Sequence, residues 1–253
     1  MGSVSLPAGV TNAKISYGAA PQQFAELRLP QAKGPFPVVA ILHGGCWVGY
    51  ADASYMARVA AGLTEHGYAS WNVEYRRATD PGGGWPNTFE DAEQGVAALR
   101  DAAAKYPLDL RRVVVIGHSA GGQLALYVGS RLKWPAIALA GIVDMAAYAE
   151  RGPAGCAEGV SEVMGGTPKQ RPERYAKVSP VGLLPLNIPQ ILIWGERDNI
   201  APEGLFIQYE KRADHVVEII RVPGAGHHDF GAAQGPAWDA ILKAVAKLLH
   251  SGS

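Results

Sequence analysis

The chain has 253 residues, of which 23 are Lys or Arg and 23 are Asp or Glu, so its formal net charge is zero. This balance argues against nucleic-acid binding, which requires a basic surface that neutralises phosphates. With 48% hydrophobic and 18% charged residues, the composition is that of a folded protein rather than a disordered chain. The length suits one α/β domain, and we expect residues 1–253 to form it.

Short apolar runs alternate with longer helical stretches along the chain. In chain order, the predicted strands are residues 37–42, 69–75, 112–116, 136–143, 190–194 and 217–222. The predicted helices are residues 55–66, 88–106, 123–132 and 237–250, with Thr88 as the N-cap of the second. This alternation predicts βαβ units, and therefore an α/β fold with a mainly parallel central sheet flanked by helices.

Residues 147–179 interrupt this alternation, because they are richer in glycine, proline and charged residues. We interpret about 145–180 as a small insertion that lies over one end of the sheet, like a cap.

Signals for a membrane or an export pathway are missing from the sequence. No apolar run reaches the ~18 residues of a membrane span, and the N-terminus lacks the basic start and apolar stretch of a secretory signal. We therefore expect a cytoplasmic protein with no membrane partner, as a monomer or a homodimer. The two cysteines, Cys46 and Cys156, are too few for a disulfide scaffold, and the sequence leaves a single bridge between them open.

The segment Gly117-His118-Ser119-Ala120-Gly121 matches the pattern Gly-X-Ser-X-Gly between a predicted strand and a predicted helix. Such a turn holds the serine in a strained backbone conformation, and the glycines let neighbouring segments approach. The helix that follows directs backbone N–H groups toward the site, which favours negative charge there. Ser119 is therefore the candidate nucleophile, and His118 is expected to touch substrate. The alternative is a plain glycine-rich turn.

A second glycine-rich segment, His43-Gly44-Gly45-Cys46-Trp47, follows the strand predicted at 37–42. Acyl transfer requires N–H donors that point at the developing oxyanion. A Gly-Gly pair presents such donors without side chains in the way. We assign the oxyanion hole to four backbone N–H groups, those of Gly44, Gly45, Cys46 and Ala120. His43 is interpreted as a brace for this loop, and Trp47 either lines the acyl site or packs in the core.

A serine of normal pKa needs a general base, and the base needs an orienting carboxylate. Asp198 follows the strand predicted at 190–194 and is expected at the same sheet edge as Ser119, with Glu196 as the rival carboxylate. For the base we favour His227, which follows Gly-Ala-Gly after the last predicted strand, and the adjacent His228 is the alternative. The order serine, aspartate, histidine is the one associated with α/β-hydrolases.

These motifs resemble those of an α/β-hydrolase of the carboxylesterase group with an HGG oxyanion loop. The loop is similar to the HGGGW motif of hormone-sensitive-lipase-like esterases and to the HGGXW motif of kynurenine formamidases, and Cys46 in place of the third glycine favours the latter. The segment Glu74-Tyr75-Arg76-Arg77 is similar to the Tyr-Arg segment of these families. The resemblance spans about residues 20–249 and implies the α/β-hydrolase fold with a triad of Ser119, Asp198 and His227.

The sequence thus predicts a serine hydrolase that cleaves short-chain or aryl carboxylic esters through an acyl-enzyme intermediate. Trp47 and Trp85, with His118, are expected to contact this small-molecule ester or amide substrate. One alternative is an arylformamidase that cleaves N-formyl kynurenine. Another is a catalytically silent α/β-hydrolase that acts as a ligand receptor. We expect no metal and no cofactor, because the sequence lacks zinc-type ligand spacing and phosphate- or dinucleotide-binding motifs.

Overall fold

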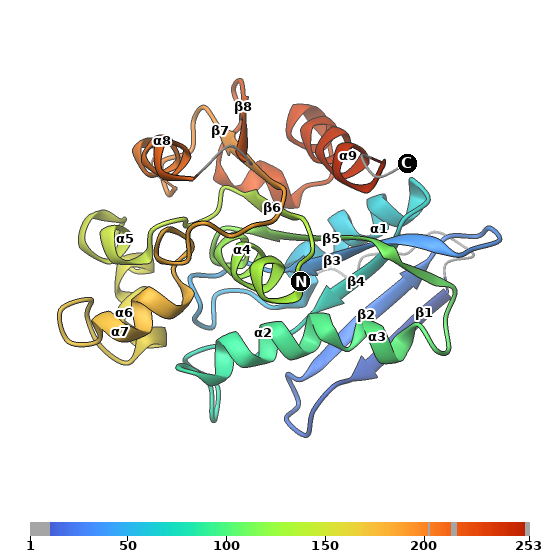
Figure 1. The fold of residues 1–253 in the computed structure, drawn as a ribbon, viewed down its shortest axis with the longest axis horizontal. Helices are drawn as coiled ribbons and strands as arrows, with labels where there is room; N and C mark the ends of the chain where they lie inside the picture. The colour runs from blue at the N-terminus through green and yellow to red at the C-terminus, as the bar shows by residue number, and fades with distance from the viewer. Residues whose placement is uncertain (1–10, 202, 214–216, 251–253) are drawn as a thin grey trace.

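The computed structural model describes residues 11–201, 203–213 and 217–250. Within these residues, eight strands form one sheet in the order β1-β2-β4-β3-β5-β6-β7-β8 (Figure 1). The strands are β1 (Thr11–Ser16), β2 (Phe24–Leu29), β3 (Phe36–Leu42), β4 (Ala69–Val73), β5 (Leu108–His118), β6 (Ala136–Leu139), β7 (Gln190–Gly195) and β8 (Val217–Val222).

The sheet is mainly parallel, as the sequence predicts. All pairs between β4 and β8 are parallel, whereas β2 pairs antiparallel with both β1 and β4. The central strands β3 and β5 are buried on both faces, and Val39, Ile41, Val114 and Ile116 are fully buried. Such continuous apolar runs are typical of parallel strands that helices cover on both sides.

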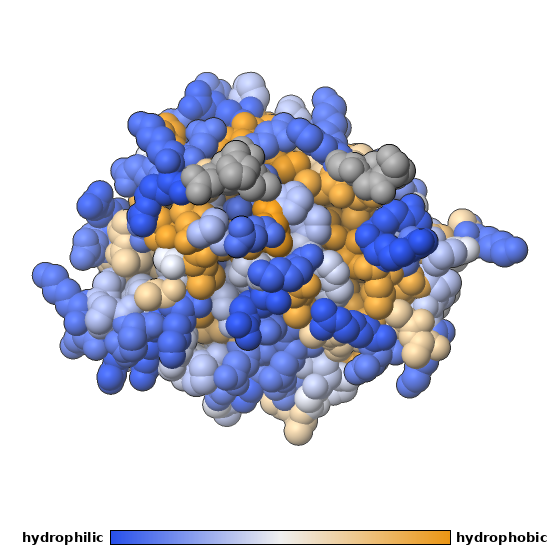
Figure 2. All heavy atoms as spheres, viewed as in Figure 1, coloured by the Kyte–Doolittle hydropathy of each residue, from blue (hydrophilic) through white to orange (hydrophobic). Residues whose placement is uncertain are grey.

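Helices cover both faces of the sheet (Figure 1). α1 (Ala57–Glu65) and α9 (Gly235–His250) lie side by side on one face, where Gly62 contacts the ring of Trp238. α2 (Asn87–Ala97) and α4 (Ala120–Leu132) are neighbours on the other face, where Phe89 meets Tyr127 edge to face. The outer surface in this view is mostly hydrophilic, with hydrophobic residues visible between the polar ones (Figure 2).

Three expectations about element boundaries are wrong. The helix predicted at 88–106 is interrupted, because α2 ends at Ala97 and α3 (Leu99–Ala102) follows. Thr88 is not the N-cap, since Pro86 holds that position and the Thr88 hydroxyl donates to the backbone oxygen of Arg76 at 2.6 Å. The strand predicted at 136–143 ends at Leu139, because Ala140 has a φ of +47°, outside the range of extended backbone.

Between β6 and β7 the chain forms three helices among the described residues, α5 (Met145–Arg151), α6 (Cys156–Met164) and α7 (Pro172–Val178). They gather at one end of the sheet, at the left in Figure 1. α6 packs closely on the loop after β3, because a Cβ atom at Gly159 would lie 2.5 Å from the Cys46 carbonyl oxygen. The insertion therefore contacts the His43–Trp47 segment directly.

Short 3-10 turns and α8 (Glu203–Arg212) complete the described fold. The turns are η1 (Ala53–Met56), η2 (Pro180–Gly182) and η3 (His227–Gly231). Among the described residues, none of the helices has the length and apolar character needed to cross a membrane.

Candidate active site

Ser119 lies in the turn between β5 and α4, with φ and ψ of 56° and −119°. A non-glycine residue rarely adopts this left-handed region, so the turn is strained. The glycines on either side of this turn allow neighbouring backbone segments to approach it closely. A Cβ atom at Gly117 would collide with the Gly121 carbonyl, and one at Gly121 would collide with the Leu42 and His43 carbonyls. The motif therefore brings the start of α4 directly against β3 and β5, as the Gly-X-Ser-X-Gly pattern predicts.

Asp198 and His227 meet across the ends of β7 and β8. His227 Nδ1 lies 2.8 Å from Asp198 Oδ2, while Asp198 Oδ1 accepts hydrogen bonds from the N–H groups of Ile200 and Ala201 at 2.8 and 2.9 Å. Burial alone would raise the pKa of Asp198, but His227 and the two N–H groups outweigh it and hold the pKa below its usual value. Asp198 is therefore a carboxylate that is hydrogen-bonded to the His227 ring.

The rival residues have other partners. Glu196 is exposed and accepts a hydrogen bond from the Gly224 N–H at 2.9 Å. His228 is exposed, and its Nδ1 lies 3.3 Å from the Tyr55 hydroxyl. Of the two adjacent histidines, it is His227 that contacts a carboxylate.

One cavity of about 260 Å³ brings these groups together. Ser119 and His227 both line it, and so do Gly45 and Cys46 of the glycine-rich loop and His118. The rest of the wall consists of Tyr50, Ala51, Tyr55, Cys156, Ile200 and His228. Among the described residues, the Ser119 hydroxyl has no hydrogen-bond partner. Hydrogen bonds between catalytic groups are often long or absent without substrate, so a missing bond does not exclude Ser119 from the site.

Unpaired backbone N–H groups lie beside Ser119. Gly45, Cys46 and Trp47 all have positive φ, between 55° and 106°, which makes the loop tight. The N–H groups of Gly45 and Cys46 find no acceptor among the described residues. Ala120 opens α4, so its N–H has no acceptor within the helix. These donors are the kind that an oxyanion hole uses. Gly44 passes close to Ser119, since a Cβ atom there would lie 3.1 Å from Ser119 Cβ.

His43 and its neighbours hold the loop in place. The His43 ring stacks on Tyr75 with centroids 4.1 Å apart and bridges the Glu74 carboxylate and the Gly44 carbonyl oxygen, at 3.1 and 2.8 Å. The Tyr75 hydroxyl donates to the His43 carbonyl oxygen at 2.7 Å. These are the contacts of a brace, the role that the sequence indicates for His43.

The two tryptophans expected to contact substrate lie elsewhere. Trp47 is fully buried, and its indole N–H donates to Gln123 Oε1 at 2.9 Å. Trp85 packs beside Phe89, with ring centroids 5.7 Å apart. Neither lines the cavity with Ser119, because both rings pack against neighbouring side chains away from it. Of the three residues expected to touch substrate, His118 is the one that lines this cavity.

Sequence reasoning missed Tyr50, Tyr55 and Ile200, which form much of the wall. None of the three belongs to a motif, so only the folded chain brings them to the cavity. It also left open the disulfide between Cys46 and Cys156, which the structure contains.

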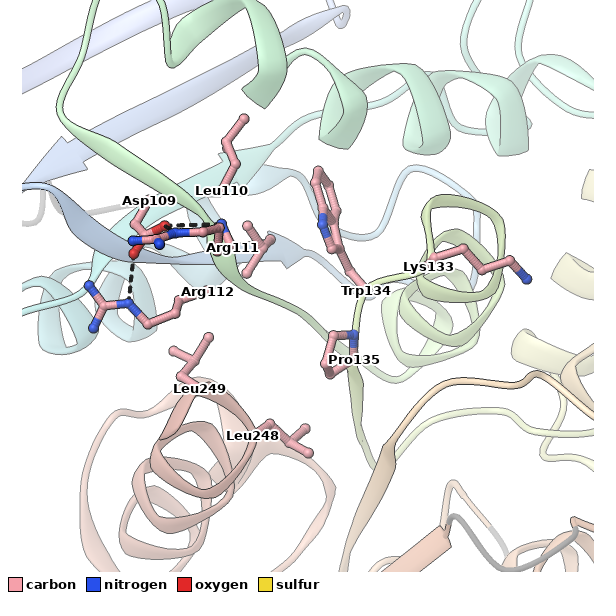
Figure 3. Close-up of a pocket in the computed structure, with 10 residues that line it drawn as sticks. Asp109, Leu110, Arg111, Arg112, Lys133, Trp134, Pro135, Leu248 and Leu249 are labelled. Atoms are coloured by element: carbon pink, nitrogen blue, oxygen red, sulfur yellow. Dashed lines mark hydrogen bonds and ion pairs between the residues drawn. The ribbon is translucent and has the colours of Figure 1, made fainter. Parts of the chain in front are cut away.

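A larger groove of about 490 Å³ lies at the opposite end of β5. Figure 3 shows that Asp109 there is held between Arg111 and Arg112, whose Nε atoms lie 3.2 and 2.8 Å from its carboxylate oxygens. None of its described lining residues is a serine, cysteine or histidine. The smaller cavity is therefore the candidate site, because it is the one of these two that is lined by a serine and by histidines.

Comparison with solved structures defines the class of protein: the chain has the α/β-hydrolase fold. A truncated carbohydrate esterase from gut microbiota matches with a TM-score of 0.80 at 20% identity, over 96% of this chain and 99% of that one. Carboxyl esterase 2 of Tuber melanosporum matches with a TM-score of 0.74 at 23% identity, over 96% and 89% of the two chains. At these identities the likeness shows the fold alone.

Sequence comparison then places the chain near esterases. The sequence model of the BD-FAE family matches residues 26–135. A probable isoprenylcysteine alpha-carbonyl methylesterase of Oryza sativa is 34% identical over 113 residues, which cover 44% of this chain and 26% of the rice protein. The chain thus spans about a quarter of the length of the curated relatives it matches. The chain thus has the α/β-hydrolase fold, and part of its sequence is similar to esterases.

Proposed function

We propose that the protein is a carboxylic ester hydrolase in which Ser119 is the nucleophile, His227 the general base and Asp198 the carboxylate that orients the base. One observation carries the proposal. The Asp198–His227 pair, Ser119 and the unpaired N–H groups of Gly45 and Cys46 come from separate parts of the chain and meet at one cavity.

The reaction would proceed in two steps. His227 Nε2 takes the Ser119 proton while the serine oxygen attacks the ester carbonyl, and the oxyanion accepts hydrogen bonds from the 44–46 loop and Ala120. His227 then gives the proton to the alcohol that leaves, and an acyl-enzyme remains. Water, deprotonated by His227, attacks the acyl-enzyme and releases the acid and free Ser119.

The size of the cavity supports a small substrate. At about 260 Å³ it lies below the ~300–1,000 Å³ of most ligand pockets. Its walls include Tyr50, Tyr55 and Ile200, which suit a short acyl group or an aryl group. The rice relative is by name an isoprenylcysteine methylesterase, in whose ester only the alcohol part, methanol, is small.

The insertion supports a role in specificity. Cys156, the first residue of α6, lines the cavity together with Cys46. We therefore take residues 145–180 to be a small cap that belongs to the same domain as the sheet, and to set the length of acyl chain that fits.

Steady-state kinetics on two substrates side by side test the proposal. p-Nitrophenyl esters from acetate to octanoate and N-formyl kynurenine would be compared, with Ser119→Ala as the control. We expect turnover of the short esters and its loss by orders of magnitude in the variant. Near-normal turnover by Ser119→Ala would overturn the mechanism. A strong preference for N-formyl kynurenine would identify the protein as an arylformamidase. No turnover of either substrate would favour the ligand-receptor alternative.

A further inference from the structure

His118, the residue before the nucleophile, makes a hydrogen bond to the backbone of the candidate base. Its Nε2 atom lies 2.8 Å from the His227 carbonyl oxygen. Because a carbonyl oxygen only accepts hydrogen bonds, Nε2 carries the hydrogen and donates it. In the neutral ring, Nδ1 is then a bare lone pair.

The surroundings of Nδ1 keep the ring neutral. This atom is buried and has no hydrogen-bond partner among the described residues, and a Cβ atom at Gly44 would lie only 3.1 Å from it. A proton on Nδ1 would find no acceptor there. Burial first, and then the charges of His227 and His228, lower the pKa of His118 to about 3. His118 is thus a fixed donor and not a proton carrier.

The His118 ring is also confined by aromatic neighbours. Its centroid lies 4.6 Å from that of His227, 5.3 Å from Tyr55 and 6.4 Å from Phe230. Only 2% of the residue is exposed. These neighbours limit the movement of the ring, and its hydrogen bond directs the Nε2–H group at the His227 carbonyl oxygen.

The loop that carries His227 is held just before this residue, where the N–H and Nε groups of Arg197 donate to the carbonyl oxygens of Ala225 and Gly224 at 2.8 and 2.6 Å. It contains Gly224 and Gly226, whose backbones have more freedom than those of other residues. The bond between Asp198 and His227 Nδ1 orients the ring, but it does not restrain the main chain from which the ring projects. The bond from His118 does so, and it starts from the residue that precedes Ser119.

We propose that His118 is a positioning residue: through its Nε2–H bond to the His227 carbonyl oxygen, it sets the distance between the base and Ser119. The inference rests on the proposed function. A small displacement of a catalytic group lowers the rate strongly, by about a hundredfold for ~1 Å, so the effect should fall on kcat. A residue that only touched substrate would affect KM instead.

Two variants separate the donated hydrogen bond from packing. His118→Gln retains an amide N–H near the position of Nε2, whereas His118→Met has similar bulk and no donor. With p-nitrophenyl acetate, we expect His118→Met to lose about tenfold or more in kcat with little change in KM, and His118→Gln to recover most of the loss. Equal losses in both variants, unchanged kcat in both, or a raised KM with normal kcat would each overturn the proposal. Urea unfolding shows whether both variants are folded.

A second readout needs no substrate. The proton between His227 Nδ1 and Asp198 should give a far-downfield ¹H NMR signal in the wild type. We expect this signal to persist in His118→Gln and to broaden or vanish in His118→Met, and an unchanged signal in both variants would overturn the proposal. If instead Ser119→Ala kept its turnover, the proposed function would fail, and the NMR comparison would still decide whether His118 positions His227.

Discussion

Cys46 and Cys156, 110 residues apart in the chain, are joined by a disulfide with their Cα atoms 4.9 Å apart. Cys46 belongs to the glycine-rich loop after β3, and Cys156 is the first residue of α6. Both line the cavity beside Ser119, so the bond ties the candidate oxyanion hole to the insertion. Disulfides persist mainly in oxidising compartments. A disulfide is therefore evidence against the cytoplasmic location that the sequence predicts. That location stays a prediction.

Reduction of the disulfide should lower the free energy of unfolding, because the bond closes a long loop and restricts the unfolded chain. We expect a loss of about 2–4 kcal/mol. Urea unfolding of the wild type with and without dithiothreitol measures it. The double variant Cys46→Ser/Cys156→Ser is the matched control, since the reductant should leave its unfolding unchanged. The same response in both proteins would show that the bond is not formed.

The two adjacent histidines should differ sharply in their effect on turnover. His227→Ala removes the ring that bonds to Asp198, and we expect kcat to fall by about 10⁴-fold or more. His228→Ala removes an exposed ring whose partner is the Tyr55 hydroxyl, and we expect kcat close to that of the wild type. Steady-state kinetics on p-nitrophenyl acetate compare them. The reverse order of losses would make His228 the base.

Those parts of the fold and of the candidate site that depend on local sequence patterns can be predicted from the sequence. The strands from 37–42 to 217–222 are visible because they are apolar runs between turns, and Ser119 because the Gly-X-Ser-X-Gly motif has a strand before it and a helix after it. The antiparallel strands β1 and β2 and helix α8 escaped prediction. Lys14 in the edge strand β1 and Glu26 in its neighbour β2 show why, because charged residues interrupt the apolar pattern of both strands.

Long-range contacts decide the remaining features. Trp47 lies in a glycine-rich loop that faces the cavity, yet its indole is drawn into the core by a hydrogen bond to Gln123, 76 residues away. Tyr55 lines the cavity although its own segment predicts a helix, because η1 replaces the first turn. Neither feature can be predicted from the periodicity of the sequence, because both depend on residues that are distant in the chain.

Gln123 should prove important for stability although it lies outside the cavity. Its amide is fully buried, accepts from the Trp47 indole N–H and donates to the Val178 carbonyl oxygen at 2.8 Å. Gln123→Leu leaves both partners unpaired, and we expect a loss of about 2–3 kcal/mol in urea unfolding. Adding Trp47→Phe removes one of these unpaired groups. The double variant should therefore lose less than the sum of the single variants, and strict additivity would contradict the bridge.

Acid should destabilise the fold in part through His118. Its pKa is about 3 in the folded protein and near the ordinary ~6.5 in the unfolded chain. As the pH falls below ~6.5 the unfolded chain binds the proton first, so the contribution is complete above that pH and is lost as the pH falls toward the folded pKa. At about pH 5 the loss should be about 2 kcal/mol. Urea unfolding at neutral pH and at about pH 5 should show a smaller loss for His118→Gln, and an equal loss would contradict the buried neutral ring.

Gly121→Ala tests how closely α4 approaches the sheet. A Cβ atom at Gly121 would collide with the carbonyl oxygens of Leu42 and His43. These are backbone atoms, so α4 has to move away from β3 to make room, and we expect a loss of about 3 kcal/mol together with most of the activity. Gly204→Ala is the matched control, because Gly204 is exposed in α8 with nothing within 4 Å of its Cβ position. Alanine is the better helix former by about 1 kcal/mol, so the control should be as stable as the wild type or slightly more stable. Urea unfolding compares the two variants, and equal stabilities would mean that the Ser119 turn does not need the close contact between α4 and β3.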